Sequence, residues 1–419
     1  MMYQKIKLPN QVRLITVPQK ETQTANLLVL VKVGSRAENL KNSGVSHFIE
    51  HLMFKGTKKR PSTLALSKEL DGVGAEFNAF TGKDYTGYYI KSDTKHLSLS
   101  IDVLADMLLN SKFDAQEIDR EKGVIVEEIN MYEDNPMMYV DDLLEQTMYA
   151  GHPLGCSIAG TRQSVKAMSQ ADLLGFKNQF YIGNNIVICL AGNFNSQHLQ
   201  ELKAKFKFPL STKKFPINKI KIKQNKSRVV LKFKETEQSQ IALGFPAYAY
   251  TDKKIYALQL LSVILGGNMS SRLFWQVRER NGLAYFIRSF LSVYEDTGAL
   301  IIQSGLDKLR VESAMALIVS ELEKIKKGVT PEELKRAKEY LFGKTALDLE
   351  DTSHLAQWYG QQELMIGKIL TPEEKNKKIT AVTLGDVALV AKDIFKINQS
   401  SLAVIGPFKN KNKFKNLLK

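Results

Sequence analysis

Apolar and polar residues alternate at the start of the chain. The segments YQKIKL (residues 3–8) and VRLITV (12–17) have a period of two, which predicts strands. The segment NLLVLVKVG (26–34) is apolar almost without interruption, as in a central strand that is covered on both faces. The chain therefore begins with two or three strands of one sheet.

A helical period follows these strands. In GVSHFIEHLMFKGT (44–57), apolar residues recur at i, i+3, i+4, i+7 and i+8, which predicts an amphipathic helix that ends near Gly56. The next 80 residues predict further elements from the same patterns. These are a helix over 64–74, a hairpin over 75–93 with its turn at 82–84, a helix over 95–113, and a long helix that begins at the cap candidate Asp114 and is interrupted at Pro136.

An internal repeat indicates the architecture. Residues 167–194 align without gaps to residues 381–408, and both segments have the pattern of cap, helix, turn and buried strand. The identical pairs are Asp172/Asp386, Asn184/Asn398, Gly192/Gly406 and Phe194/Phe408. Residues 88–108 and 113–120 have counterparts at 300–322 and 329–336. We predict an α+β fold with two homologous domains, each a mixed or antiparallel sheet covered by helices, at residues 1–212 and 228–419 with a linker at 213–227.

Candidate chemistry lies on the helix around residue 50. His47 and His51 are four residues apart on the side opposite the apolar stripe, so both imidazoles can reach one metal ion. Glu50 points to the same region, and the order HxxEH is a signature of zinc peptidases. The alternative is a helix whose histidines simply occupy a solvated face.

A catalytic zinc site needs a third protein ligand. The helix that begins near residue 114 offers Glu121, Glu127, Glu128 and Glu133. Glu121 and Glu128 share a face, but two helical turns separate them by roughly 10 Å, so only one can be a ligand and the other at most orients a ligand. From the spacing alone Glu127 also stays open.

The second half of the chain lacks this chemistry. Where the histidine helix should repeat, residues 256–267 read YALQLLSVILGG, with apolar side chains at the corresponding places. Aligning Arg120 with Arg336 sets Lys344 against Glu128. Only the first half is expected to bind a metal.

Composition limits the partners and the cellular location that we expect for this protein. The 419 residues carry a net charge of +15, but the lysines are scattered and no nucleic-acid module is present, so we expect no nucleic-acid partner. No apolar run of 18 residues and no leader pattern occurs, which predicts a cytoplasmic protein without membrane association. Cys189 lies in an apolar run, so we expect a buried free thiol and no disulfide with Cys156.

These motifs resemble those of the pitrilysin/insulinase family of zinc metallopeptidases. The resemblance rests on three segments: HFIEHLMFKGT (47–57), EKGVIVEE (121–128), whose last residue Glu128 follows His51 by 77 residues, and GGNMSSRLFWQVRERNGLAYFIRS (266–289). It covers nearly the whole chain. The chain is most similar to the two-domain branch that includes bacterial processing-peptidase-like enzymes and the mitochondrial processing peptidase β subunit.

The resemblance implies a role for each matching residue. It implies one Zn²⁺ per chain held by His47, His51 and Glu128, with Glu50 as general base and Glu121 as a supporting carboxylate. It also implies that Arg278 and Tyr285 bind the substrate carbonyl, and that the strand containing Asn78 and Ala79 takes an extended peptide as an added strand.

The resemblance further implies an endopeptidase that cleaves unstructured peptides inside a clamshell of two chains. Because this chain carries both half-sites, we predict a homodimer in which the zinc of one subunit faces Arg278 and Tyr285 of the other; a heterodimer is the competing arrangement. The alternative function is a non-catalytic scaffold or core-type subunit of the same fold.

Overall fold

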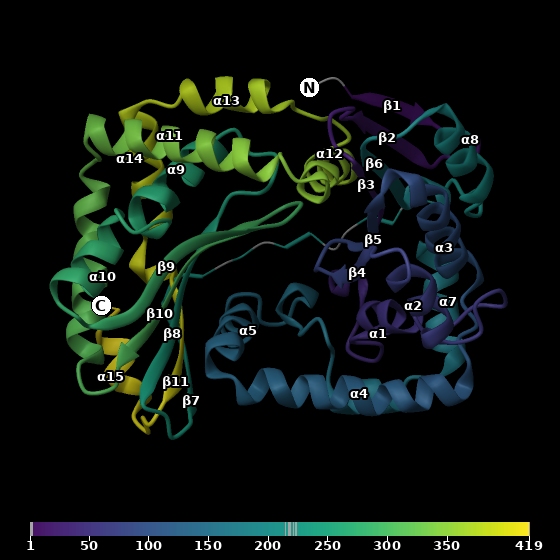
Figure 1. Ribbon diagram of the computed structural model, residues 1–419. Coiled ribbons are helices and arrows are strands. Elements are labelled where there is room, and N and C mark those ends of the chain that lie inside the picture. The colour runs from purple at the N-terminus through teal and green to yellow at the C-terminus, as the bar shows by residue number, and fades with distance from the viewer. Residues whose placement is uncertain (1–2, 214, 217–218, 221, 223, 419) are drawn as a thin grey trace. The chain divides into compact units, whose positions relative to one another are not determined.

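Two compact units make up the protein, and each takes segments from both halves of the chain (Figure 1). The computed structural model describes residues 3–213, 215–216, 219–220, 222 and 224–418. The first unit consists of Met1–Ile129, Cys156–Asn218 and Thr345–Pro372. The second unit consists of Asn130–Gly155, Lys219–Lys344 and Glu373–Lys419.

A six-stranded mixed sheet forms the centre of the first unit. Its order is β1-β2-β6-β3-β5-β4, in which β2 and β6 are parallel and all other neighbours are antiparallel. The strands are β1 (Gln4–Lys7), β2 (Arg13–Pro18), β3 (Thr24–Val31), β4 (Glu76–Thr81), β5 (Thr86–Asp93) and β6 (Ile186–Gly192). Strand β3 lies inside the sheet and is buried along nearly its whole length, which confirms the central strand predicted from its apolar run.

Helices cover both faces of this sheet. The helices that lie wholly or mostly in the first unit are α1 (Val45–Leu52), α2 (Thr63–Asp71), α3 (Leu97–Asn110), α4 (Ala115–Asp134), α6 (Arg162–Ala167), α7 (Gln170–Phe180), α8 (Ser196–Lys205) and α12 (Thr352–Ile366). Helix α12 packs on β3 and β6, where its buried Leu355 and Tyr359 meet apolar side chains such as Leu28 and Val187. The second face of the first sheet is thus covered by a helix from the C-terminal half of the sequence.

The second unit repeats this plan. Its five-stranded sheet has the order β7-β11-β8-β10-β9, with β7 and β11 parallel and the other neighbours antiparallel. The strands are β7 (Arg228–Phe233), β8 (Gln238–Ala247), β9 (Ala284–Val293), β10 (Gly298–Asp307) and β11 (Ser401–Gly406). Apart from β1, the two sheets have the same order of equivalent strands, which confirms the predicted duplication.

The second unit also contains a helix from the other half of the sequence. They are α5 (Pro136–Met148), α9 (Ile255–Gly266), α10 (Val311–Lys326), α11 (Pro331–Asp348, up to Lys344), α13 (Pro372–Thr380), α14 (Leu384–Ile394) and α15 (Lys411–Asn416). Helix α5, from the N-terminal half, packs on β8 and β11. Each sheet is therefore completed by a helix that lies in the other half of the sequence.

The repeat that the sequence reveals at 167–194 and 381–408 folds into α7 with β6 and into α14 with β11. Both helices begin with a capping box, in which Ser169 and Asp172 or Thr383 and Asp386 exchange hydrogen bonds. The aspartate shared by the two segments is thus a helix cap, and its repetition reflects local structure.

The domain bounds 1–212 and 228–419 stay a prediction, since the compact units are discontinuous in sequence. Of the predicted linker at 213–227, residues 214, 217–218, 221 and 223 lie outside the described residues. The two cysteines are free, and Cys189 is buried in β6 as predicted.

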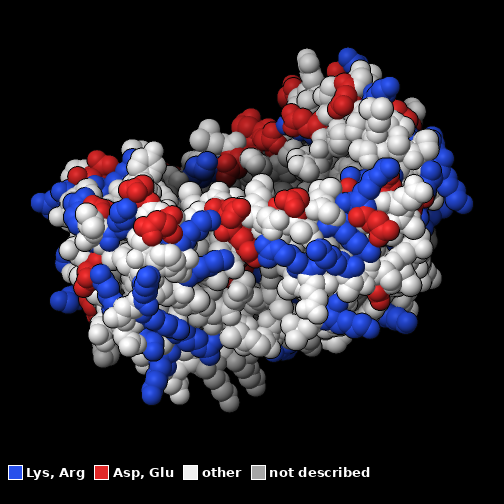
Figure 2. All heavy atoms as spheres, turned by 90° about the horizontal axis from the view of Figure 1, so that it is seen from below, with Lys and Arg blue, Asp and Glu red and all other residues white. Residues whose placement is uncertain are grey.

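Positive and negative side chains are mixed on the face of the molecule seen in Figure 2. On the face seen in Figure 2, Lys and Arg side chains alternate with Asp, Glu and uncharged residues. Within the described part of the chain, no helix is both long and apolar enough to span a bilayer. The cytoplasmic location stays a prediction.

Candidate metal centre and its surroundings

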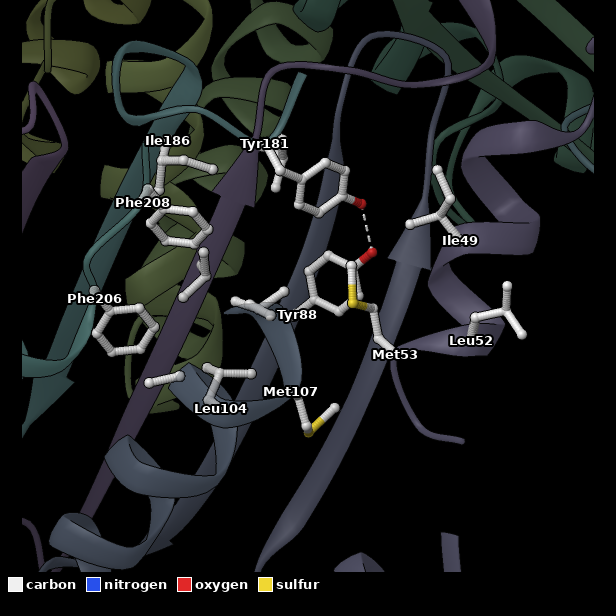
Figure 3. Close-up of a cluster of buried hydrophobic side chains, with 14 of the residues drawn as sticks. Ile49, Leu52, Met53, Tyr88, Leu104, Met107, Tyr181, Ile186, Phe206 and Phe208 are labelled. Carbon is white, nitrogen blue, oxygen red and sulfur yellow. Dashed lines mark hydrogen bonds between the residues drawn. The ribbon is translucent and has the colours of Figure 1, made fainter. Parts of the chain in front are cut away.

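The apolar side of α1 anchors the helix in the core of the first unit. Phe48, Ile49, Leu52 and Met53 are at most 1% exposed. All four belong to the same buried cluster as Tyr88 and side chains of α3, and Figure 3 shows Met53 beside Tyr88. Burying each such side chain contributes about 1.5–3 kcal/mol. This packing fixes the direction in which the opposite, polar side of α1 points.

The beginning of α1 is held by backbone geometry and by a distant carboxylate. Gly44, the residue before the helix, has φ of 92°, and a Cβ there would lie 2.7 Å from the carbonyl oxygen of Ala159. The buried carboxylate of Glu38 accepts the backbone N–H groups of Gly44 and Ser46, at 2.6 and 2.8 Å. Burial raises the pKa of Glu38 to about 7, although these N–H groups oppose the shift. Glu38 thus caps the helix that carries both histidines.

The two histidines of α1 meet at their Nε2 atoms. His47 Nε2 and His51 Nε2 are 3.3 Å apart, and their ring centroids are separated by 4.6 Å. His47 is buried at 9% exposure, whereas His51 is partly accessible. The two rings meet edge to face, with 71° between their planes, so the predicted approach of two imidazoles at i and i+4 is present.

Glu128 of α4 approaches the same point. Its Oε1 lies 3.6 Å from Nε2 of His47, and its Oε2 lies 3.4 Å from Nε2 of His51. One ligand atom from each of the three residues lies within 4.8 Å of the other two, and no other described group of His, Cys, Asp and Glu has this arrangement. Glu127 is exposed and lies outside the group, so the geometry selects Glu128 between the two neighbours.

Glu121 occupies the other side of His51. Its Oε2 lies 2.9 Å from His51 Nδ1, and its Oε1 pairs with Lys55 Nζ at 2.5 Å. In a neutral imidazole, a carboxylate at Nδ1 favours the tautomer that carries its proton there, so Nε2 is the nitrogen that can bind a metal once its own proton has left. The supporting position implied for Glu121 is thus present. Lys55, which neutralises Glu121, was not singled out from the sequence.

The electrostatics of the two histidines differ. Burial lowers the pKa of His47 to about 4, and the nearby charge of His51 acts in the same direction. Burial also lowers the pKa of His51, but hydrogen bonds and charges of Glu121 and Glu128 outweigh it and raise that pKa to about 9. The hydrogen bond from His51 in turn lowers the pKa of Glu128. Without a metal, His51 is therefore the protonated imidazole of the two near neutral pH.

These donor atoms fit a zinc ion. Zinc–nitrogen bonds of about 2.0–2.1 Å in a tetrahedral site place neighbouring ligand atoms roughly 3.3 Å apart. The two Nε2 atoms are 3.3 Å apart, and each lies 3.4–3.6 Å from one of the two Glu128 oxygens, so both nitrogens and the carboxylate are close to the spacing that one ion requires. Two imidazoles and one carboxylate leave a fourth position for water, as in catalytic zinc sites. One proton must leave His51 when the ion binds.

Glu50 lies beside this group without belonging to it. Its Oε2 accepts a hydrogen bond from the hydroxyl of Thr81, with 2.5 Å between the oxygens. Burial raises the pKa of Glu50, while the hydrogen bond from Thr81 lowers it. A raised pKa favours a group that must both take and release a proton. Thr81 was not predicted as a site residue, because a threonine at a strand end carries no signal of its own.

Strand β4 forms one edge of the first sheet. It pairs with β5 on one side, with Asn78 opposite Tyr89 and Ala79 opposite Tyr88, and the described residues place no strand on the other side. Asn78 is exposed, and its Oδ1 accepts the backbone N–H of Ala79 at 2.8 Å. An added strand that used this N–H would replace the side-chain bond with a main-chain bond.

Arg278 and Tyr285 belong to the second unit. Arg278 lies in the π-helical segment Phe274–Arg280, and its guanidinium stacks 4.8 Å from the ring of Phe274. Tyr285 is the second residue of β9 and is 74% exposed. A tyrosine this exposed leaves its hydroxyl available to a ligand, whereas the sequence alone also allowed a place at the edge of the core.

Comparisons with known proteins follow the same division into halves. The sequence profile described as "Insulinase (Peptidase family M16)" matches residues 13–162, and the profile "Peptidase M16 inactive domain" matches residues 167–341. The second profile covers sequence that supplies none of the three candidate ligands.

Curated relatives cover nearly the whole chain. An uncharacterized zinc protease of Streptomyces coelicolor is 37% identical, over 96% of this chain and 89% of its own length. The uncharacterized zinc protease YmxG of Bacillus subtilis is 36% identical, over 96% and 97%. A crystal structure of a protease from Helicobacter pylori has a TM-score of 0.92 at 26% identity, covering 97% of this chain and 99% of that one. The names of these relatives support a zinc protease.

Proposed function

Because the chain belongs to the insulinase family, peptidase family M16, we propose that it is a zinc-dependent endopeptidase that hydrolyses extended, unstructured peptides. The observation that carries the proposal is the convergence of His47, His51 and Glu128 on one point, with Glu50 beside them. The carboxylate of Glu50 beside the three candidate ligands supports an enzyme rather than the alternative, a non-catalytic subunit of the same fold, because a general base needs this position.

In this proposal the metal supplies two effects when bound: it lowers the pKa of a water molecule and it polarises the peptide carbonyl. Glu50 accepts the proton of the attacking water and passes it to the nitrogen of the leaving amine. Glu121 keeps the proton of His51 on Nδ1, so that Nε2 stays a ligand. Arg278 and Tyr285 donate hydrogen bonds to the negatively charged oxygen of the tetrahedral intermediate.

Substrate selection follows from the edge strand. A peptide that adds to β4 gains main-chain hydrogen bonds, which depend little on its sequence but require it to be extended. Asn78 and Ala79 stand at the middle of that edge. The proposed substrates are therefore unfolded segments and short peptides.

The direct test is cleavage of a quenched fluorogenic peptide by the zinc-loaded chain and by the Glu50→Gln variant. Removing the base is expected to lower kcat by about 10²–10⁴-fold, because general-base catalysis contributes that much. The variant keeps all three ligands, so its zinc content should equal that of the wild type. Equal cleavage by both proteins would instead favour the scaffold or core-type subunit.

We further propose that the active form is a homodimer, with Arg278 and Tyr285 acting on the zinc site of the partner subunit. Mixing Glu50→Gln chains with Arg278→Ala chains tests this directly. A mixed dimer would hold one intact site, so a random mixture should recover about a quarter of the wild-type activity. If each site uses residues of one chain only, the mixture stays inactive. Light scattering of the purified chain distinguishes a homodimer from a monomer that needs a second, different chain.

A further inference from the structure

Thr81 joins the edge strand β4 to the proposed general base. It is the last residue of β4, two positions beyond Ala79, and its hydroxyl donates to Oε2 of Glu50 at 2.5 Å. Within the described residues, this is the hydrogen bond that the Glu50 carboxylate makes to the rest of the protein. Oε1 of Glu50 makes no hydrogen bond to the described residues.

We propose that Thr81 is a positioning residue for the hydrolytic reaction: by holding Oε2, it orients the Glu50 carboxylate so that Oε1 receives the proton of the attacking water. The inference rests on the proposed peptidase function. The terminal torsion of a glutamate is broad, so the backbone of α1 alone does not fix the plane of the carboxylate. A hydrogen bond to a charged acceptor is short and strong enough to do so.

The hydroxyl of Thr81 is itself held in place. Thr81 pairs with Thr86 across the hairpin, and Gly82 donates its N–H to the carbonyl of Tyr85 at 2.8 Å. The hairpin tip also accepts the N–H groups of Ser35 and Arg36 at its carbonyl oxygens, at 3.1 and 2.9 Å. A β-branched residue has few side-chain rotamers, which restricts the hydroxyl further. The hairpin therefore presents the donor from a rigid backbone.

The arrangement has a consequence for catalysis. The strand proposed to receive the peptide and the strand that orients the base are the same strand, β4. A peptide that pairs with this edge would be aligned by the same backbone that aligns Glu50. A small shift of β4 would move the bound peptide and the Glu50 carboxylate together, so the distance between the peptide and the base would be preserved.

The test compares Thr81→Val, which removes the hydroxyl and keeps the shape, with Thr81→Ser, which keeps the hydroxyl. Thr86→Val is the matched control, because Thr86 lies directly opposite and donates its hydroxyl to the carbonyl of Val33. We expect Thr81→Val to lower kcat by about 10- to 100-fold, the scale for a misplaced catalytic group. Zinc content and KM should stay within about twofold, and Thr81→Ser and Thr86→Val should keep kcat within about threefold of wild type.

A crystal structure of each Thr81 variant gives a readout that is independent of activity. The Glu50 carboxylate should occupy one orientation in wild type and Thr81→Ser, and several in Thr81→Val. Unchanged kcat in a zinc-loaded Thr81→Val, or equal losses in the Val and Ser variants, would overturn the proposal. If Thr81→Val does not fold, Thr81→Ala against Thr81→Ser decides by the same criteria. An inactive wild type would count against the peptidase function, whereas an active wild type beside an equally active Thr81→Val would count only against Thr81.

Discussion

Helices α1 and α9 occupy equivalent places in the two units, each following the strand that enters the middle of its sheet. Helix α1 buries one side and directs His47, Glu50 and His51 away from the core. Helix α9 is buried almost all round, and its sequence IYALQLLSVILG contains no residue that could bind zinc. The same fold therefore accepts at this place either an amphipathic helix that carries the candidate ligands or a mostly apolar helix that carries none.

The partner helices differ in the same sense. With Arg120 aligned to Arg336, Glu121 of α4 corresponds to Ala337 of α11, which is buried at 2% exposure, and Glu128 corresponds to Lys344. An alanine cannot orient a histidine, and a lysine ammonium has no lone pair to offer a metal. The comparison teaches that the fold does not depend on the site, since one unit keeps the architecture without any of its donors.

The largest effect is expected from making α1 resemble α9. His51→Leu removes one of three ligands, so zinc content should fall from about one per chain to near zero, and peptide cleavage should be lost. His354→Leu, at an exposed histidine of α12, is the matched control and should change neither quantity. Zinc analysis by mass spectrometry with a cleavage assay measures both. Zinc retained at full occupancy in His51→Leu would contradict the assigned centre.

Zinc affinity should depend strongly on pH, because the ion must displace the proton of His51. With the pKa of His51 near 9 in the metal-free protein, the apparent affinity should fall about tenfold for each pH unit below 9. Calorimetric titration at pH 7 in two buffers of different ionisation enthalpy should show release of about one proton. Affinity that stays constant from pH 9 to pH 7 would contradict the raised pKa.

Stability of the metal-free protein should change with pH in the opposite direction. A histidine whose pKa is raised on folding stabilises the protein fully below its unfolded value of about 6.5, and this contribution is lost as pH rises through 9. His47 adds little slope between pH 7 and pH 9, because with a folded pKa of about 4 and an unfolded value of about 6.5 it is mostly neutral in both states there. Urea unfolding of the metal-free wild type and His51→Gln at pH 7 and pH 9 measures the difference; the variant should show the smaller fall.

A smaller effect is expected from giving α4 the character of α11 at its supporting position. Glu121→Gln keeps the ligands but loses the charge that fixes His51, so the zinc dissociation constant should rise about 10- to 100-fold. Glu127→Gln, at an exposed carboxylate of the same helix, should leave that constant unchanged. Competition with a chelator provides the measurement. Equal constants for wild type and Glu121→Gln would remove Glu121 from the site.

The smallest effect is expected from the reverse exchange. The double variant Ala337→Glu, Lys344→Glu places both carboxylates on α11, but α9 still offers no imidazole. Zinc content should stay at about one per chain, because two carboxylates without an imidazole are a poor zinc site. A second equivalent of tightly bound zinc would show that the two units differ less than their helices indicate.

Sequence periodicity predicted much of this fold. The stripe of α1, the alternation of β2, the buried run of β3 and the capping segments before α7 and α14 are local patterns, and each forms the expected element. Periodicity did not predict that α5 and α12 each complete the sheet of the other half. An amphipathic helix shows which side it buries, but its sequence does not say which sheet will cover that side.

The candidate metal centre was also predictable only in part from the sequence. The spacing of His47, Glu50 and His51 was enough to place them on one side of one helix, because four residues nearly complete a helical turn. The choice of Glu128 over Glu127, the pairing of Glu121 with His51 and Lys55, and the contacts of Glu38 and Thr81 depended on how distant segments pack. Local sequence determines which side of an element a residue occupies. Only the tertiary structure decides which sides meet, because the core that orients α1, α4 and β4 is shared among all of them.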